Sequence, residues 1–269
     1  MKIQIRPIIF MAVFLATVAI YVVSQTTDSL FMGTVYLFFP LAAALIALFT
    51  SRMYGFNNAN GRALLLITGG LVFWGIAETI TYILNSFTDN TQYPTIANLF
   101  LLLSYPLIGM GIYQGYVAAE VKLKQVKKSL IAIVLSISLI LTVLVAYYGV
   151  YQAYDPDAEL LANIVNLGYG IGDLILVITS MLTILVAREY RGGKLATFWK
   201  TIAVGFFLFL IADIMFAMHG GQYTDDLYEV CMELTWIAAY IVLAFAILEN
   251  YINISAIQKR IKLIIQQRQ

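Results

Sequence analysis

Four acidic residues lie inside long apolar stretches of this sequence rather than at their ends: Glu78, Asp173, Asp213 and Glu233. An ionised carboxylate at the centre of a bilayer is costly, so such residues normally face a protein interior or water. They are therefore candidate site residues. The alternative is that they are protonated, or paired with tyrosine, threonine and backbone groups, and only hold helices together.

Aromatic side chains accompany these acids. Trp74 and Tyr82 stand one helical turn before and after Glu78 and share its helix face, and Tyr105 and Tyr240 also lie deep in apolar runs. Acidic groups between aromatic walls suit an organic cation or amine, through ionic and cation–π contacts. Core packing with hydroxyl groups bonded between helices explains the same pattern.

Several kinds of chemistry are excluded by what the sequence lacks. Cys231 has no partner for an intramolecular disulfide, and His219, as a single histidine, cannot build a multi-histidine zinc or haem site. No lysine lies in an apolar run, so a retinal Schiff base has no amine. Gly170-Ile171-Gly172-Asp173 matches the GxGD motif of intramembrane aspartyl proteases, but the partner aspartate of that family precedes the motif, whereas Asp213 follows it. We expect no enzyme, cofactor or metal, with the protease as the alternative.

The elements that carry the acids are membrane helices. Of 269 residues, 61% are apolar or aromatic and only 12% are charged, with a mean hydropathy of +0.86, whereas a soluble domain is roughly half apolar and a quarter charged. At about 20 apolar residues per crossing, the chain has room for roughly eight or nine helices and little else. The apolar runs predict eight helices, the first retained rather than cleaved as a signal peptide: 7–24, 30–51, 62–86, 95–118, 129–149, 159–187, 198–219 and 227–250.

Charges alternate in sign between consecutive connections. All 16 Lys and Arg residues fall in the N-terminal segment, after the second, fourth and sixth helices, or in the C-terminal tail, and the other connections carry acids without bases. The positive-inside rule then places both termini in the cytoplasm. On this orientation Asp173 and Asp213 lie near the middle of the membrane, and Asn98 and Glu233 lie near its outer surface. We expect a cavity open to the outside, and an inner half of the bundle without polar site groups.

An internal repeat is predicted by a gapless shift of 135 residues, which lays the third and fourth helices over the seventh and eighth. The shift pairs Glu78 with Asp213, Tyr105 with Tyr240, and Asn98 with Glu233. The interpretation is two parallel four-helix repeats, at 1–120 and 128–250, related by an axis along the membrane normal, followed by a tail at 251–269. If the halves meet at this axis, Glu78 and Asp213 should share one polar cavity with Asp173 within reach.

The tail has an apolar stripe. Ile254, Ile257, Ile261 and Ile264 are spaced by three, four and three residues, with lysine, arginine and glutamine filling most other positions. This pattern is typical of a coiled coil that would pair two copies of the chain, or of a basic amphipathic helix on the inner leaflet. Two heptads leave both interpretations open.

Part of the sequence resembles a known membrane region. Trp74-x-x-x-Glu78-x-x-x-Tyr82, Tyr93-Pro94-Thr95-x-Ala97-Asn98-Leu99-Phe100 and Ser104-Tyr105-Pro106-Leu107-x-Gly109 look like the amino-terminal multi-helix input region of prokaryotic diguanylate cyclases and sensor kinases. Asn98 stands where that family usually has aspartate. The resemblance implies a sensory role. No GGDEF or kinase domain follows, so the sequence is either a stand-alone relative or a piece whose tail begins a signalling helix.

Together these features predict an all-α, multi-pass cell-membrane protein that senses or binds a small molecule or cation from the outer side. Glu78 and Asp213 would be paired acids, Asp173 the floor, and Asn98 and Glu233 the entrance, with the last helix and tail reporting occupancy. A secondary transporter or proton-coupled carrier is the alternative, because midplane acids at a repeat interface are typical of such proteins. A structural subunit of a membrane complex is the third. The expected partners are the lipid bilayer, the ligand and a second copy, without nucleic acid.

Overall fold

The protein is all-helical in the residues that its computed structural model describes, namely 12–13, 15–19, 29–88, 93–190, 193–219 and 227–267. Within these ranges, seven α-helices are long and apolar enough to cross a membrane, which is the architecture of a multi-pass membrane protein. Their bounds are α2 Ser29–Tyr54, α3 Ala59–Phe87, α4 Ile96–Ala118, α5 Lys128–Leu144, α6 Leu160–Glu189, α7 Lys194–Met218 and α8 Leu227–Gln266. A short 3₁₀ turn, η1 (Leu123–Gln125), precedes α5, and a π-helical turn, η2 (Val145–Tyr151), continues it.

The seven predicted helices from 30–51 onward are confirmed within a few residues at most ends. One end differs, because α8 runs past residue 250 to Gln266. The fifth helix ends at Tyr151, close to the predicted 149, but changes from α-helical to π-helical geometry at Val145. The predicted first helix, 7–24, lies largely outside the described residues, although 12–13 and 15–19 are helical. The eighth crossing therefore stays a prediction.

The turn between α2 and α3 shows how local sequence ends one helix and starts the next. Gly55 has φ of +88°, which glycine adopts without a Cβ clash. Its N–H donates to the carbonyls of Ser51 at 3.0 Å and Arg52 at 3.1 Å, closing α2. Asn58 then caps α3 by accepting the N–H of Asn60 at 2.9 Å. The short connection makes α2 and α3 antiparallel neighbours.

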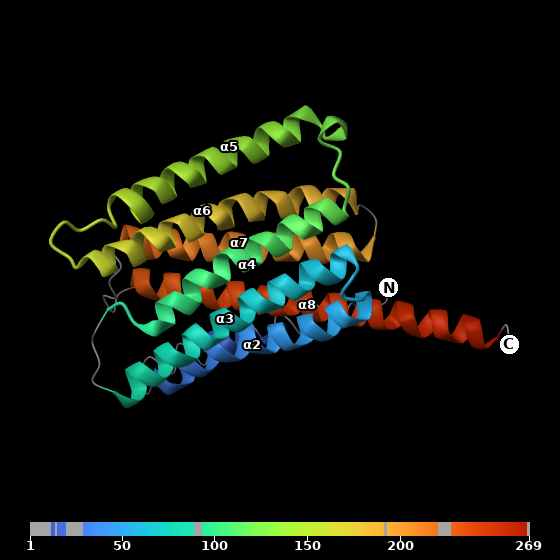
Figure 1. The fold of residues 1–269 in the computed structure, drawn as a ribbon, viewed down its shortest axis with the longest axis horizontal. Coiled ribbons are helices and arrows are strands. Elements are labelled where there is room, and N and C mark those ends of the chain that lie inside the picture. Colours follow the sequence, from blue (N-terminus) through green and yellow to red (C-terminus); the bar gives the residue numbers. More distant parts are fainter. Residues whose placement is uncertain are drawn as a thin grey trace.

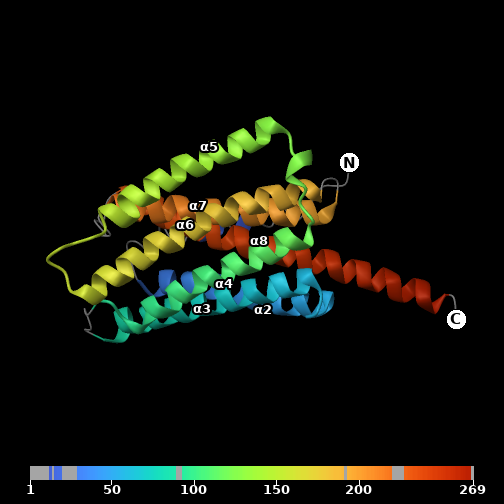
Figure 2. The same ribbon diagram turned by 45° about the horizontal axis from the view of Figure 1, so that its top comes forward.

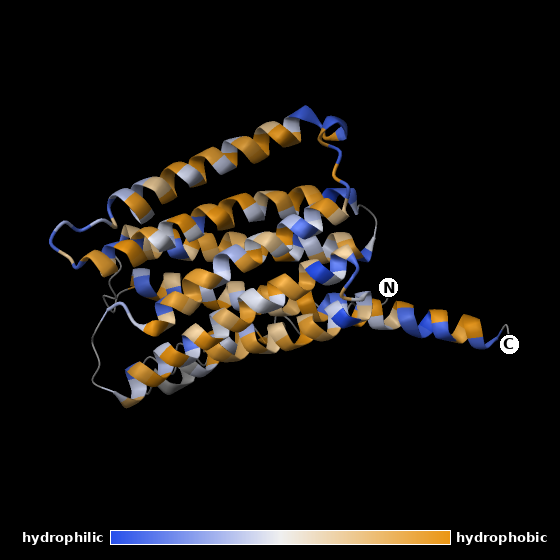
Figure 3. Cartoon of the chain, in the orientation of Figure 1, coloured by the Kyte–Doolittle hydropathy of each residue, from blue (hydrophilic) through white to orange (hydrophobic). Residues whose placement is uncertain are grey.

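Six helices form a closed ring. α2, α3, α4, α6, α7 and α8 each pack against the next in this order, and α8 packs against α2. α5 lies outside the ring against α6 and η2, and both views show it standing apart from α4 (Figures 1 and 2). We call the end of the bundle with the connections at 55–58 and 119–127 the basic end, and the end with the connection at 152–159 the acidic end. Apolar residues run along the helices, and hydrophilic ones gather at these ends and on the protruding part of α8 (Figure 3).

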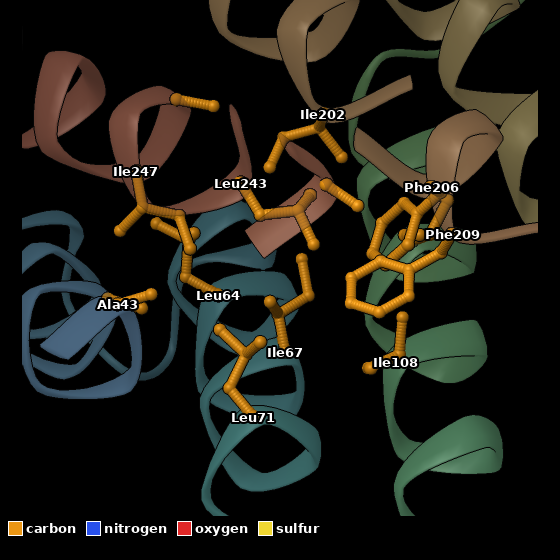
Figure 4. Close-up of a cluster of buried hydrophobic side chains, with 14 of the residues drawn as sticks. Ala43, Leu64, Ile67, Leu71, Ile108, Ile202, Phe206, Phe209, Leu243 and Ile247 are labelled. Atoms are coloured by element: carbon orange, nitrogen blue, oxygen red, sulfur yellow. The ribbon is translucent and has the colours of Figure 1, made fainter. Parts of the chain in front are cut away.

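Aliphatic and phenylalanine side chains fill the centre of the ring (Figure 4). Glycines let the helices approach closely there, as small residues do in membrane bundles. A Cβ on Gly70 would come 2.5 Å from Ile108, and a Cβ on Gly205 would come 2.5 Å from Leu243. Both members of the second pair lie 135 residues after those of the first.

The C-terminal tail is a direct continuation of α8. The helix has 40 residues, about 60 Å at 1.5 Å per residue, and its last turns project beyond the bundle (Figure 1). Gln258 Nε2 donates to the Met53 carbonyl at 2.7 Å, which ties the start of the tail to the end of α2. Ile257, Ile261 and Ile264 are exposed. The tail thus leaves the bundle as a straight rod with its apolar stripe open.

Candidate ligand-binding site

Glu78 on α3 and Asp213 on α7 both accept hydrogen bonds from α8. Tyr240 Oη donates to Glu78 Oε1 at 2.7 Å, and the Trp74 indole is within hydrogen-bonding reach of the same carboxylate. Trp236 Nε1 donates to Asp213 Oδ1 at 2.8 Å. The Asp213 charge also acts on Glu78. The two acids therefore lie around one region of the ring, bridged by side chains of α8.

Asp173 on α6 lies beside Asp213. Its Oδ1 is 3.4 Å from Tyr105 Oη, and its carboxyl group is in hydrogen-bonding contact with that of Asp213. Such a contact requires a proton on one of the two carboxyls, or else a cation between them. Asp213 Oδ2 is buried and has no donor in the described part of the chain. The structure thus brings Glu78, Asp173 and Asp213 together, with no nitrogen or alcohol donor of the described residues on Asp213 Oδ2.

Four aromatic rings pack beside these acids. The Phe209 ring centroid lies 4.3 Å from that of Trp74 and 4.7 Å from that of Tyr240, and Trp74 and Tyr240 are 5.7 Å apart. Tyr105 completes the group at 6.2 Å from Trp74. Trp74 and Phe209 each precede an acid by one helical turn, so they lie on its basic side. Phe209 also belongs to the apolar cluster (Figure 4), which separates the acids from the basic end.

Glu233 and Asn98 lie nearer the acidic end and bond to neighbouring helices. Tyr36 Oη of α2 donates to Glu233 Oε2. Asn98 Nδ2 donates to Tyr169 Oη of α6 at 2.7 Å, while its Oδ1 accepts the Thr95 N–H at 2.6 Å and caps α4. An amide both accepts and donates, which an ionised aspartate does not. Asn98 can therefore cap α4 and join it to α6 at once.

Three residues singled out in the sequence lie apart from the acids. The Tyr82 ring packs edge-on against Phe87 at the end of α3, and no hydrogen bond between Tyr82 and an acid occurs among the described residues. The His219 ring stacks on Tyr228 at 4.9 Å. Cys231 is exposed. Sharing a face with Glu78 did not bring Tyr82 into the cluster, because α3 continues past the acids toward its end.

Sequence reasoning did not assign Tyr36, Tyr169, Trp236 and Phe209 to the site. Trp236 and Tyr169 stand out as polar aromatics deep in apolar runs, which is a usable signal. Tyr36 has no such local signal, because the carboxylate that it binds is 197 residues away. Phe209 is indistinguishable from a core residue until the ring of helices places it between Trp74 and Tyr240.

No basic side chain of the described residues forms an ion pair with these acids. In the described ranges the one ion pair joins Arg188 to Glu189. Glu78, Asp213 and Glu233 are half-buried, and Asp173 is buried. A site with several carboxyl groups, no cation of its own and partial access favours a positively charged or proton-donating ligand. The outward-facing cavity expected there stays a prediction.

One expectation about polar groups can be compared with the structure. The half of the bundle at the basic end, which was expected to lack polar site groups, contains the buried Asn250, whose Oδ1 accepts from Tyr54 Oη at 3.2 Å. A polar side chain near a helix end is tolerated because a neighbouring helix supplies a partner.

The glycines of the GxGD sequence occupy close packing contacts. A Cβ on Gly172 would come 2.7 Å from the Tyr105 ring, and a Cβ on Gly170 would come 2.4 Å from the Gly149 carbonyl oxygen. Gly170 therefore permits η2 to approach α6, and Gly172 permits the Tyr105 ring to lie against α6 near Asp173.

Comparison with protein-family models, with curated proteins and with solved structures finds no match to this chain.

Proposed function

We propose that the protein is a membrane-embedded sensory module that binds an organic cation or amine at the Glu78, Asp173 and Asp213 cluster. The observation that carries this proposal is the cluster of carboxyl groups around Asp213, whose buried Oδ2 receives no hydrogen bond from a nitrogen or alcohol group of the described residues. An ammonium group would donate to it and balance the charge. Trp74 and Tyr240 offer the aromatic faces that attract such a cation.

The proposed signal passes through α8. This one helix supplies the donors to both Glu78 and Asp213, carries Glu233, and continues without a break to Gln266. A ligand that takes over one of these hydrogen bonds changes how α8 is held in the ring. Because α8 is a continuous rod, a shift or rotation at the site is carried to the tail.

Three further features belong to the proposal. The two halves are repeats related by an axis along the membrane normal. The matching contacts of Gly70 and Gly205 support this repeat. So does the packing of α4 against α6, which corresponds to the packing of α8 against α2. The basic end faces the cytoplasm of a prokaryotic cell, as the distribution of lysine and arginine favours. The resemblance of residues 74–109 to input regions of diguanylate cyclases and sensor kinases supports the sensory role.

Thermal unfolding in detergent with and without benzylammonium tests the site. We expect benzylammonium to raise the unfolding temperature and its neutral isostere, benzyl alcohol, to leave it unchanged at equal ionic strength. Asp213→Asn should abolish the shift. Asp157→Asn removes an exposed acid at the acidic end and should retain it. The proposal is contradicted by the absence of a shift in the wild type, or by the same shift in Asp213→Asn.

A proton-coupled transporter is the second candidate, favoured by the paired carboxyls of Asp173 and Asp213. Such a pair can hold and release one proton as a cation arrives and leaves. Vesicles containing the protein separate the two functions. The sensor moves neither radiolabelled tetraethylammonium nor protons, whereas flux that Asp213→Asn abolishes would replace the sensor with the transporter.

A further inference from the structure

A cavity of about 380 Å³ lies at the basic end, where the chain leaves α4 and turns toward α5. Its lining combines two lysines, two uncharged polar side chains and two aliphatic ones: Lys122, Lys124, Tyr116, Gln125, Val121 and Leu123. Arg188 at the end of α6 donates to the Gln125 carbonyl. The turn that forms the cavity is therefore fastened to the helix beside it.

The cavity carries the positive charge of two lysines. Neither Lys122 nor Lys124 forms an ion pair in the described structure, where Arg188 and Glu189 make the single pair. Ammonium groups, a tyrosine hydroxyl and a glutamine amide can all donate hydrogen bonds to a phosphate oxygen. The lining therefore suits a phosphate.

An exposed apolar stripe lies along α6, the helix whose Arg188 bonds to the turn that forms the cavity. On one side α6 contacts α4 through Gly168 and Gly172, and on another it contacts η2 and α5 through Gly170 and Val177. At about 100° per residue, a stripe of more than half-exposed isoleucines falls between these two faces: Ile164, Ile171 and Ile178. The stripe is thus an exposed apolar face of α6 between its contacts with α4 and its contacts with α5.

We propose that this cavity binds the phosphate of one anionic phospholipid of the bilayer. The phosphate lies between Lys122 and Lys124, and an acyl chain runs along α6 as far as Ile178. α4 ends at Ala118, so a cavity formed just after it lies at headgroup depth when the helices span the membrane. From Arg188 to Ile178 α6 rises about 15 Å, which is one leaflet of the roughly 30 Å hydrocarbon core.

Native mass spectrometry of the full chain tests this proposal with phosphatidylglycerol and phosphatidylcholine of the same acyl chains. We expect one phosphatidylglycerol retained per chain in preference to phosphatidylcholine. A lysine near an anionic lipid contributes roughly five-fold in affinity. The double variant Lys122→Gln/Lys124→Gln should therefore reduce the preference on the order of 20-fold. Lys122 and Lys124 are both exposed, so this variant should have the same unfolding temperature as the wild type in phosphatidylcholine.

The matched control is Lys127→Gln/Lys128→Gln, which removes the same charge where the connection meets the start of α5 and does not alter the cavity lining. It should keep most of the preference. Equal losses in the two double variants would mean diffuse surface attraction and overturn the site. Wild-type protein without any preference for phosphatidylglycerol would overturn it as well.

Two further measurements test the chain and the headgroup separately. Ile178→Trp adds bulk on the exposed face of α6 that the acyl chain would reach, and it should weaken binding of both lipids by a similar factor. Unchanged binding would show that no acyl chain lies there. Inorganic phosphate should not displace phosphatidylglycerol, and efficient displacement would reduce the site to one for a free phosphate. A protein bound to this face in place of lipid would assign it to a partner helix and overturn the proposal.

Discussion

Replacing Gly70 by alanine should destabilise the bundle, whereas the same replacement at the adjacent Gly69 should not. A Cβ on Gly70 would come 2.5 Å from Ile108 Cγ1 and 3.0 Å from the Ser104 carbonyl oxygen. Carbon atoms in contact normally lie about 3.5–4.0 Å apart. Ile108 is fully buried and the carbonyl belongs to α4, so neither can withdraw without moving the helix. A Cβ on Gly69 would meet only Leu107 Cδ1, at 3.6 Å.

The expected magnitude follows from two opposing effects. Overpacking of this kind costs about 1–3 kcal/mol. The higher helix propensity of alanine stabilises both variants by up to about 1 kcal/mol. The propensity effect cancels when the two neighbours are compared. We therefore expect Gly70→Ala to be less stable than Gly69→Ala by about 1–3 kcal/mol, with Gly69→Ala equal to the wild type or slightly more stable.

The assay is denaturant-induced unfolding in one mild detergent, followed by tryptophan fluorescence and by circular dichroism. Gly205→Ala extends the comparison, because Gly205 lies 135 residues after Gly70 and its Cβ would come 2.5 Å from Leu243. It should lose a similar free energy of unfolding. Equal stability of Gly69→Ala and Gly70→Ala would refute the packing argument, and an unaffected Gly205→Ala would remove one support of the internal repeat.

Two other substitutions probe the acid cluster. Tyr240→Phe removes the 2.7 Å hydrogen bond to Glu78 and should lower the free energy of unfolding by about 0.5–3 kcal/mol. Its control, Tyr113→Phe on the exposed face of α4, should leave the free energy of unfolding unchanged. Equal effects of the two variants would show that the hydrogen bond to Glu78 does not stabilise the protein. Gly172→Ala would place a Cβ 2.7 Å from the Tyr105 ring and should lower the free energy of unfolding by about 1–3 kcal/mol. It should also reduce the rise in unfolding temperature that benzylammonium causes. A free energy of unfolding equal to that of the wild type would show that the ring moves aside freely.

The amino-acid sequence alone determined which segments are helices and in what depth order their residues lie. Apolar runs of about 20 residues are a local signal, and turn residues such as Gly55 and Asn58 end and start helices through contacts a few residues away. Depth follows from counting residues along a helix axis. This is why Asp173 and Asp213 could be assigned similar depths before any fold was known.

Only the tertiary structure decided which faces of the helices meet. The contact between Asp173 and Asp213, and the bond from Tyr36 to Glu233, join residues on different helices whose rotation no local pattern specifies. Tyr82 shows the converse, since it shares a helix face with Glu78 but packs against Phe87. In a chain that is apolar on nearly every side, periodicity does not mark a core face, because lipid and protein interior are equally apolar. Close packing at glycines such as Gly70 and Gly172 sets the rotations instead, and it depends on side chains that are distant in sequence.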